Sequence, residues 1–487
     1  MTQRYSTKKF TPDNRESPNP YQWNLAGLRR YTTRRIGGFS TKHLWGNSMQ
    51  KVTVDSIIEK IQLNKVHYYI VVTAALGFMF DSFDTYIVAY AMPSIIKEWA
   101  ITPVQNGMLT SAGFWGMFLG SMILGPVADR FGRKLGFILT IMGFSVLTGL
   151  TALSGDVYQF GIIRFLTGMF LGGMIPINTA MVSEYVSAKH RGRFAAVLTI
   201  LWPFGLLAAS LASLTLVTTH GWRVLFYIGA LPAMLAIVVV WKVPESPRWL
   251  SIRGRTRDVG KVLKKLGARD EDLVGLESEK LAEKVPVTVL LHKQYIRRFI
   301  LTGGYYFFSY FGYYGFVLWL PTILATVYNL DLARTFTYTL YVAIAAILGR
   351  LTAFYTIEKF GRKQLFYVGF GIGGVAALVF GQLQDPSMLV IGACVLSWLY
   401  EQGVAGTVVW TAELYPSQVR ATATCWSTGL GRVSSAVAPV VFGYFMANGM
   451  YYAIFVTMAI SFWIAVALVF FLGIETKGKT LQEVGAA

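Results

Sequence analysis

The sequence is poor in charge and in the side chains from which enzymes build active sites. Only 14% of its 487 residues are charged and 54% are hydrophobic, which excludes an ordinary soluble globular protein. The two cysteines, Cys394 and Cys425, both fall inside apolar runs, so we expect no disulfide framework and no cysteine metal site. The five histidines are scattered without zinc spacing or a nucleophile partner. We therefore expect no metal, no catalytic residues and no enzymatic activity.

Acidic residues are the scarcest charges, with 25 Asp and Glu against 44 Lys and Arg. The basic excess lies in short segments between apolar runs, which argues against nucleic-acid binding. The stretch from Gly473 to Thr480 matches the phosphate-loop pattern. It follows an apolar helix rather than a strand, and only seven residues come after it, so we expect no nucleotide and no cofactor.

Twelve apolar runs dominate what remains, each long enough to cross about 30 Å of hydrocarbon. They cover about 68–92, 104–127, 135–153, 157–184, 193–217, 222–242, 298–325, 335–356, 365–383, 387–413, 421–446 and 451–473. Lys and Arg collect in the even-numbered connections, and an even number of spans places both ends on one side. The positive-inside rule therefore predicts a multi-pass protein of the cell (plasma) membrane with both termini in the cytoplasm.

The polar segments suggest five regions. Residues 1–66 form a basic tail with twelve Lys or Arg against four acids. This tail ends in a short amphipathic helix, since Val54, Ile57, Ile58 and Ile61 have helical spacing. We expect six-helix bundles at 67–242 and 298–473, a cytoplasmic linker at 243–297 and a second tail at 474–487.

Charged motifs recur at a fixed distance along the chain. Asp129 and Glu358 are 229 residues apart, as are Glu184 and Glu413. Such an offset indicates a duplicated unit. The motifs supply the residues that we expect to act as a cytoplasmic gate: Asp129, Arg130, Arg133, Glu184, Arg191, Glu245, Glu358, Arg362, Glu413, Arg420 and Glu475.

Ionisable residues inside the apolar runs are the candidates for coupling, because each is costly there unless paired or wetted. Asp81 and Asp84 lie one helical turn apart in the first run. Counting about 1.5 Å per residue places Arg164 of the fourth run at a similar depth. We predict an Asp–Arg pair for proton coupling, in which Asp81 and Asp84 carry the proton and the nearness of Arg164 changes their affinity for it. A static structural ion pair is the alternative.

The second half contains Glu401 and Arg432, both near the middle of their runs. Arg432 is the candidate for holding an anionic group, because guanidinium binds a carboxylate with two parallel hydrogen bonds. The alternative is that Arg432 only neutralises Glu401. Ten aromatic residues lie between Tyr305 and Trp319, where a ring-shaped substrate could stack. The remaining candidates for substrate binding are Trp202, Tyr306, Tyr310, Tyr313 and Tyr314.

These motifs resemble a known family. The stretch from Gly125 to Lys134 is similar to the signature loop of the major facilitator superfamily, and residues 358–363 resemble its second copy. Pro244–Leu250 and Glu413–Pro416 resemble the sugar-porter-like branch. The resemblance implies an all-α membrane protein with 12 transmembrane helices in two pseudo-symmetric six-helix bundles. It also implies alternating access, with the cytoplasmic charge clusters locking the outward-open state.

A narrower resemblance concerns the substrate. Asp81-Ser-Phe-Asp84 is similar to an element of the aromatic-acid:proton symporters, and Gly431-Arg432 through Pro439 resembles the nicotinate and metabolite:proton symporters. Sugar porters carry Gln where this chain has Thr199. The resemblance thus implies proton-coupled symport of a small organic anion such as an aromatic carboxylate. A sugar or polyol:proton symporter is the alternative, and a non-transporting sensor a third. We expect a monomer in the lipid bilayer.

Overall fold

The computed structural model describes residues 52–278 and 286–478, and these residues are almost entirely helical. Within them, 12 helices are long and apolar enough to cross a membrane. The basic tail at residues 1–50 and the end of the phosphate-loop match, Lys479 and Thr480, lie outside the described residues. The fold is therefore the predicted all-α arrangement, while the exact domain boundaries stay predictions.

The first half contains six spans whose starts follow from local sequence. Asn64, Thr102 and Asp156 accept hydrogen bonds from backbone N–H groups of the first turns of three helices, which satisfies donors that a helix start leaves open. The spans are α2 (Lys65–Trp99), α3 (Pro103–Phe131), α4 (Arg133–Thr151), α5 (Val157–Tyr185), α6 (Ala188–Ala212) with a π-helical turn (Ser213–Val217) and α7 (Thr218–His220), and the pair α8 (Arg223–Ile228) and α9 (Ala233–Lys242).

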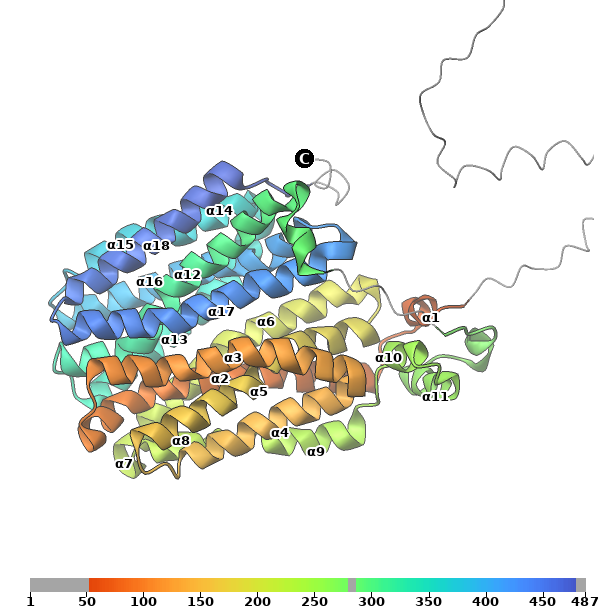
Figure 1. The fold of residues 1–487 in the computed structure, drawn as a ribbon, viewed down its shortest axis with the longest axis horizontal. Helices are drawn as coiled ribbons and strands as arrows, with labels where there is room; N and C mark the ends of the chain where they lie inside the picture. Colours follow the sequence, from red (N-terminus) through yellow and green to blue (C-terminus); the bar gives the residue numbers. More distant parts are fainter. Residues whose placement is uncertain (1–51, 279–285, 479–487) are drawn as a thin grey trace, which may run out of the picture. The chain divides into compact units, whose positions relative to one another are not determined.

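The second half repeats this plan. Its spans are α12 (Lys293–Thr326), α13 (Leu332–Phe360), α14 (Arg362–Phe366) with a π-helical segment (Tyr367–Ile372) and α15 (Gly373–Phe380), α16 (Pro386–Glu413), α17 (Ser417–Ala447) and α18 (Tyr451–Leu472). Asp331 and Asp385 cap the starts of α13 and α16. Figure 1 shows α2 to α9 on one side of the bundle and α12 to α18 on the other.

Glycines allow some helices to approach until their backbones touch. A Cβ added at Gly120 of α3 would lie 1.8 Å from the carbonyl oxygen of Met169 in α5, and one at Gly168 of α5 would lie 2.0 Å from that of Gly113. Without a hydrophobic force between helices in lipid, such close packing stabilises a membrane bundle. Glycines, which have no side chain, thus allow α3 and α5 to cross with their backbones in contact.

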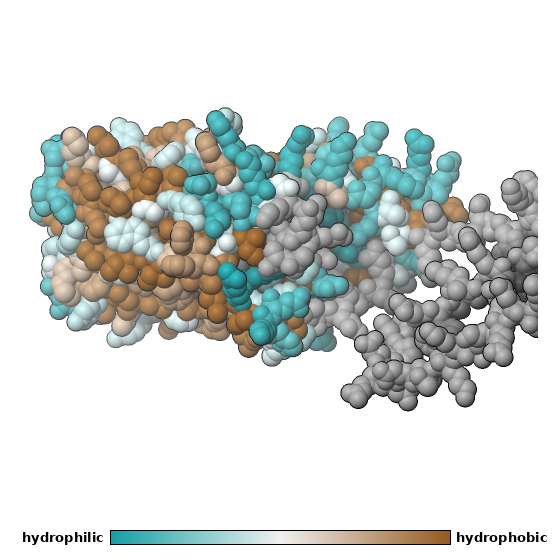
Figure 2. Space-filling view, turned by 90° about the horizontal axis from the view of Figure 1, so that it is seen from above, coloured by the Kyte–Doolittle hydropathy of each residue, from teal (hydrophilic) through white to brown (hydrophobic). Residues whose placement is uncertain are grey.

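The residues that precede α2 dock on the linker. Helix α1 (Val54–Lys60) lies beside α10 (Pro247–Ile252) and α11 (Thr256–Leu266), as Figure 1 shows. The Asn64 amide donates to the carbonyl of Lys265 over 2.9 Å, and Asp55 lies 3.4 Å from Arg248. We call this end of the bundle the linker side and the opposite end the far side. On the face shown in Figure 2, hydrophobic residues cover the middle of the bundle and hydrophilic ones gather toward the linker side.

The two halves meet most tightly at the far side. A Cβ added at Gly107 of α3 would lie 2.5 Å from the carbonyl oxygen of Pro439 in α17, and one at Gly443 would lie 2.6 Å from that of Pro103. The Ser111 hydroxyl donates to the carbonyl of Ala436 over 2.5 Å. These contacts lie near the start of α3 and the end of α17, so the structure is closed at the far side.

Candidate substrate and proton site

Asp84 and Arg164 form a buried ion pair between α2 and α5. Arg164 Nη2 lies 2.5 Å from Asp84 Oδ2, and Nη1 donates to Oδ1 over 3.1 Å. The Thr148 hydroxyl of α4 also donates to Oδ1 over 2.5 Å. Side chains from α4 and α5 therefore hold the carboxylate of α2. Breaking a buried ion pair of this kind is costly. The depth counted along the sequence for Asp81 predicted an Asp–Arg pair with Arg164, and the structure forms this pair with Asp84. Thr148 was missed because a threonine within an apolar run gives no signal.

Asp81 lies one turn earlier on α2 in a very different environment. Its side chain is 0% exposed, and neither carboxylate oxygen has a hydrogen-bond partner among the described residues. The opposite charge that acts on it most strongly is that of Arg432, on α17 of the other half. An ionised carboxylate without hydrogen bonds is strongly disfavoured in such a place. Asp81 is therefore the group of this site that most needs a proton or a cation.

Glu401 is paired with Arg350, which corrects the alternative that Arg432 neutralises it. Arg350 Nη2 of α13 lies 2.5 Å from Glu401 Oε2 of α16, and both side chains are buried. The physical reason is the crossing of α13 and α16 at Gly349, where an added Cβ would lie 2.8 Å from the Trp398 carbonyl oxygen. The sequence analysis missed Arg350, although a charge within the eighth apolar run was a visible signal.

Arg432 is left without an acidic partner. Its guanidinium donates to the sulfur of Met117 in α3 over 3.4 Å, and no carboxylate among the described residues lies within 4.0 Å of it. The side chain is half-buried. The preceding Gly431 makes room for the ring of Tyr310, since an added Cβ would lie 3.0 Å from that ring. Arg432 and Tyr310 thus stand side by side with part of each exposed.

The aromatic candidates divide into an accessible and a buried set. Tyr310 and Trp202 are half-buried, whereas Tyr306, Tyr313 and Tyr314 are buried. Tyr314 meets Phe114 of the first half with ring centroids 5.1 Å apart. The hydroxyl of Tyr313 lies 3.3 Å from that of Tyr86 on α2. Tyr313 and Tyr314 therefore join the two halves, and Tyr310 and Trp202 are the aromatic candidates with part of the side chain exposed.

A second group of charges lies at the linker side, where the sequence predicted the gate. Arg133 donates to Glu184 over 3.0 Å and to Asp129 over 2.6 Å. In the second half, Arg362 donates to Glu413 over 3.0 and 2.7 Å. Each cluster holds together helices of one half.

Two residues of the predicted gate bind main-chain groups instead. Arg191 donates to the carbonyl of Val186 over 3.4 Å, and Arg420 donates to that of Tyr415 over 3.2 Å. Each arginine stands seven residues after a gate glutamate but closes the end of the preceding helix. Arg130 contributes its carbonyl oxygen to Arg253 over 2.8 Å. Their part in a gate stays a prediction.

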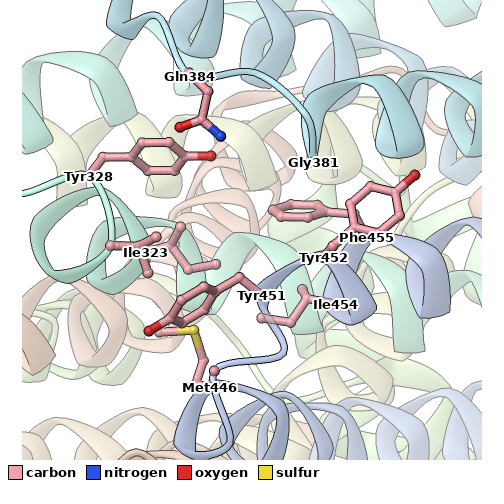
Figure 3. Close-up of a pocket in the computed structure, with 11 residues that line it drawn as sticks. Ile323, Tyr328, Gly381, Gln384, Met446, Tyr451, Tyr452, Ile454 and Phe455 are labelled. Carbon is pink, nitrogen blue, oxygen red and sulfur yellow. The ribbon is translucent and has the colours of Figure 1, made fainter.

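A pocket of about 340 Å³ lies apart from these residues, on the far side of the second half. Figure 3 shows Tyr328 and Gln384 on one side of it and Tyr451 and Met446 on the other. None of its lining residues is charged, so it offers no counter-ion to an anionic ligand. The charged residues between the halves remain the better candidate site.

Comparison with known protein families identifies the family to which this chain belongs. The family model described as "Sugar (and other) transporter" matches residues 64–487, which includes all twelve spans. The chain belongs to this family of transporters. It is thus a transporter and not an enzyme, and the predicted multi-pass membrane architecture is confirmed.

Relatives within the family place it more narrowly. The niacin transporter of Acinetobacter baylyi is 33% identical over 88% of this chain and 99% of its own length. The gallate transporter of Pseudomonas putida is 26% identical over 82% of this chain and 90% of its own. Among solved structures, the inward-open xylose transporter of E. coli matches with a TM-score of 0.67 and 18% identity, over 86% of this chain and 99% of that one. The resemblance to aromatic-acid and nicotinate transporters is confirmed, and the solved structure supports the fold alone.

Proposed function

We propose that this transporter couples proton movement to the transport of a small aromatic carboxylate. Relatives named as transporters of niacin, gallate and benzoate support this substrate class. The site offers what such a substrate needs. Arg432 is a guanidinium with no acidic partner in the part of the chain that the structure describes, and Tyr310 and Trp202 are half-buried rings at which an aromatic group can stack.

The observation that carries the proposal is the isolation of Asp81. In this structure, the charge of Arg432 is the main attraction that favours the ionised form of Asp81. When a substrate carboxylate binds Arg432, it neutralises the charge of Arg432, which then no longer favours the ionised form of Asp81. Asp81 then remains as a buried carboxylate with no partner and takes up a proton. One anion and one proton are therefore carried together. Asp84 and Arg164 hold the helix that bears Asp81.

Orientation follows from the basic connections of the sequence. We place the linker side in the cytoplasm, with both termini there, and the chain in the cell membrane as a monomer that uses no nucleotide. Closure at the far side then corresponds to an inward-facing state. The linker-side clusters, which bind within each half here, face one another when that side closes and the outward-open state forms.

The test is uptake of radiolabelled benzoate or nicotinate into proteoliposomes with an imposed pH gradient. Asp81→Asn cannot take up the proton, so we expect it to abolish pH-driven accumulation while exchange of labelled for unlabelled substrate stays measurable. Asp331→Asn is the matched control, because Asn caps the start of α13 as well as Asp does. If Asp81→Asn accumulates substrate as the unaltered protein does, Asp81 is not the proton carrier.

The sugar or polyol symporter is the second candidate, favoured only by the family's general description. Competition separates the two. Unlabelled nicotinate, but not a hexose, should reduce uptake of labelled benzoate. Competition by a hexose alone would favour the sugar symporter. Absence of any flux would favour a non-transporting sensor.

A further inference from the structure

The Arg350–Glu401 pair has no part in the charge balance described above, although its charges act on the hydroxyl groups of Tyr310 and Tyr313. Arg350 is 6% exposed and Glu401 is 2% exposed. Ion pairs so deeply buried contribute little net stability, because desolvation offsets their attraction. A pair of leucine-like residues would hold α13 and α16 together at least as well. The pair therefore calls for a role other than stabilising the fold.

The pair is held in place by its surroundings. Gly349 brings α13 against α16, and an added Cβ would lie 2.9 Å from Cβ of Glu401. The next residue, Gln402, donates to the carbonyl of Gly349 over 2.8 Å and to the hydroxyl of Thr352, and it accepts from Thr356 over 3.0 Å. Since the backbone on both sides is fixed, neither charged side chain has room to turn away from the other.

The guanidinium of Arg350 still has unused binding capacity. Its Nε–H has no hydrogen-bond partner among the described residues, so the carboxylate of Glu401 satisfies it only in part. The charges of Arg350, Glu401 and Arg432 all act on the hydroxyl of Tyr310. The charges of two guanidinium groups thus act on the same half-buried tyrosine. One of them has no acidic partner among the described residues, and the other already holds a carboxylate of the protein.

We propose that Glu401 is a built-in carboxylate that occupies Arg350 and so restricts the site to substrates with a single carboxylate. The inference rests on the proposed function and adds a specificity-determining residue to it. With Glu401 in place, a substrate carboxylate finds one guanidinium, Arg432. A second substrate carboxylate would meet the negative charge of Glu401 and remain without a partner, which excludes a dicarboxylate by repulsion as well as by lost binding.

The test compares uptake of benzoate with that of its dicarboxylate analogues phthalate and terephthalate. The unaltered protein should take up benzoate much faster than either dicarboxylate. Glu401→Gln removes the internal carboxylate and leaves Arg350 for a second substrate carboxylate. The ratio of dicarboxylate to benzoate uptake should rise about tenfold or more, as a charge-assisted pair is worth at least 1.4 kcal/mol. An unchanged ratio in a variant that still transports benzoate overturns the proposal.

A second variant covers the case in which Glu401→Gln does not fold with an unpaired arginine. In the double variant Arg350→Met with Glu401→Gln, both charges are gone, and such replacements of buried pairs are usually tolerated. It should transport benzoate and still reject dicarboxylates, because the second guanidinium is absent. Loss of benzoate uptake in the folded double variant would mean that Arg350 binds the substrate, contrary to the proposal. Absence of benzoate uptake in the unaltered protein would instead reject the proposed function.

Discussion

The two charge clusters at the linker side occupy equivalent positions in the two halves, but each contains a glutamate with different surroundings. In the first half, Glu245 accepts hydrogen bonds from the backbone N–H groups of Lys134 and Ser246 over 3.0 and 2.8 Å. In the second half, Glu475 accepts from those of Arg362 and Lys363 over 3.1 and 3.0 Å. Both carboxylates lie at a helix start, where backbone N–H groups favour negative charge.

The difference lies in what covers each glutamate. The linker helix α10 covers the first cluster, where the Trp249 indole donates to the carbonyl of Asp129 over 2.8 Å. Burial raises the pKa of Glu245. For Glu475, burial also acts to raise the pKa, but hydrogen bonds from the backbone N–H groups of Lys363, Lys477 and Arg362 outweigh it, and the pKa is lowered. The same position in the repeat thus holds one carboxylate whose pKa is above the ordinary value and one whose pKa is below it.

The largest effect on stability should come from substituting the glycines that lie against these carboxylates. Gly132 and Gly361 have φ of 116° and 95°, a region that side chains disfavour by about 1–3 kcal/mol. An added Cβ would lie 2.2 Å from Glu245 Oε2 at Gly132 but 2.9 Å from Glu475 Oε2 at Gly361. We expect Gly132→Ala to lower the thermal unfolding temperature in detergent more than Gly361→Ala does. Gly192→Ala, with open space around it, is the control and should not lower the unfolding temperature, because alanine favours a helix more than glycine does; equal losses in the first two would contradict the comparison.

An intermediate effect should appear when the two glutamates are neutralised. At neutral pH, Glu475→Gln should destabilise by about 1 kcal/mol, since it loses charge-assisted hydrogen bonds in a partly exposed place. Glu245→Gln should be nearly neutral, because burial already disfavours the charge that it removes. Thermal unfolding of the purified variants measures both.

The pH dependence should run in opposite directions for the two glutamates. The stabilisation from Glu475, whose pKa is lowered, is present above the ordinary value of 4.5 and is lost as pH falls through the lowered pKa. Glu245, whose pKa is raised, favours the fold in its protonated form, so its contribution is lost as pH rises above 4.5 through the raised pKa. The cost of Glu475→Gln should therefore vanish in acid. If the loss of stability in Glu475→Gln does not depend on pH, the pKa of Glu475 is not lowered in the folded protein.

The smallest effect concerns the acids four residues before each arginine. Asp129 lies 2.6 Å from Arg133 and is 42% exposed, whereas Glu358 lies 4.0 Å from Arg362 and is 78% exposed. Double-mutant cycles on unfolding should give a coupling of about 0.5 kcal/mol for the first pair and about zero for the second, as for other exposed ion pairs. A larger coupling for the second pair would reverse the comparison.

Much of this architecture was predictable because it repeats along the chain. The twelve spans follow from apolar length, and the offset between Asp129 and Glu358 located both clusters. What could not be predicted depends on rotation about helix axes. Asp81 and Asp84 are both deep enough to meet Arg164, and only the crossing of α2, α4 and α5 selects Asp84. Arg350 was visible as a charge within an apolar run, but its pairing with Glu401 depends on how α13 and α16 cross at Gly349.

The contacts of Gly107 and Gly443 at the far side have a mechanical consequence. At these two points main chain rests on main chain, so the contact cannot be opened by the rotation of a side chain. Passage requires α3 and α17 to part as rigid rods. Their separation would expose Pro103 and Pro439 together, in one movement.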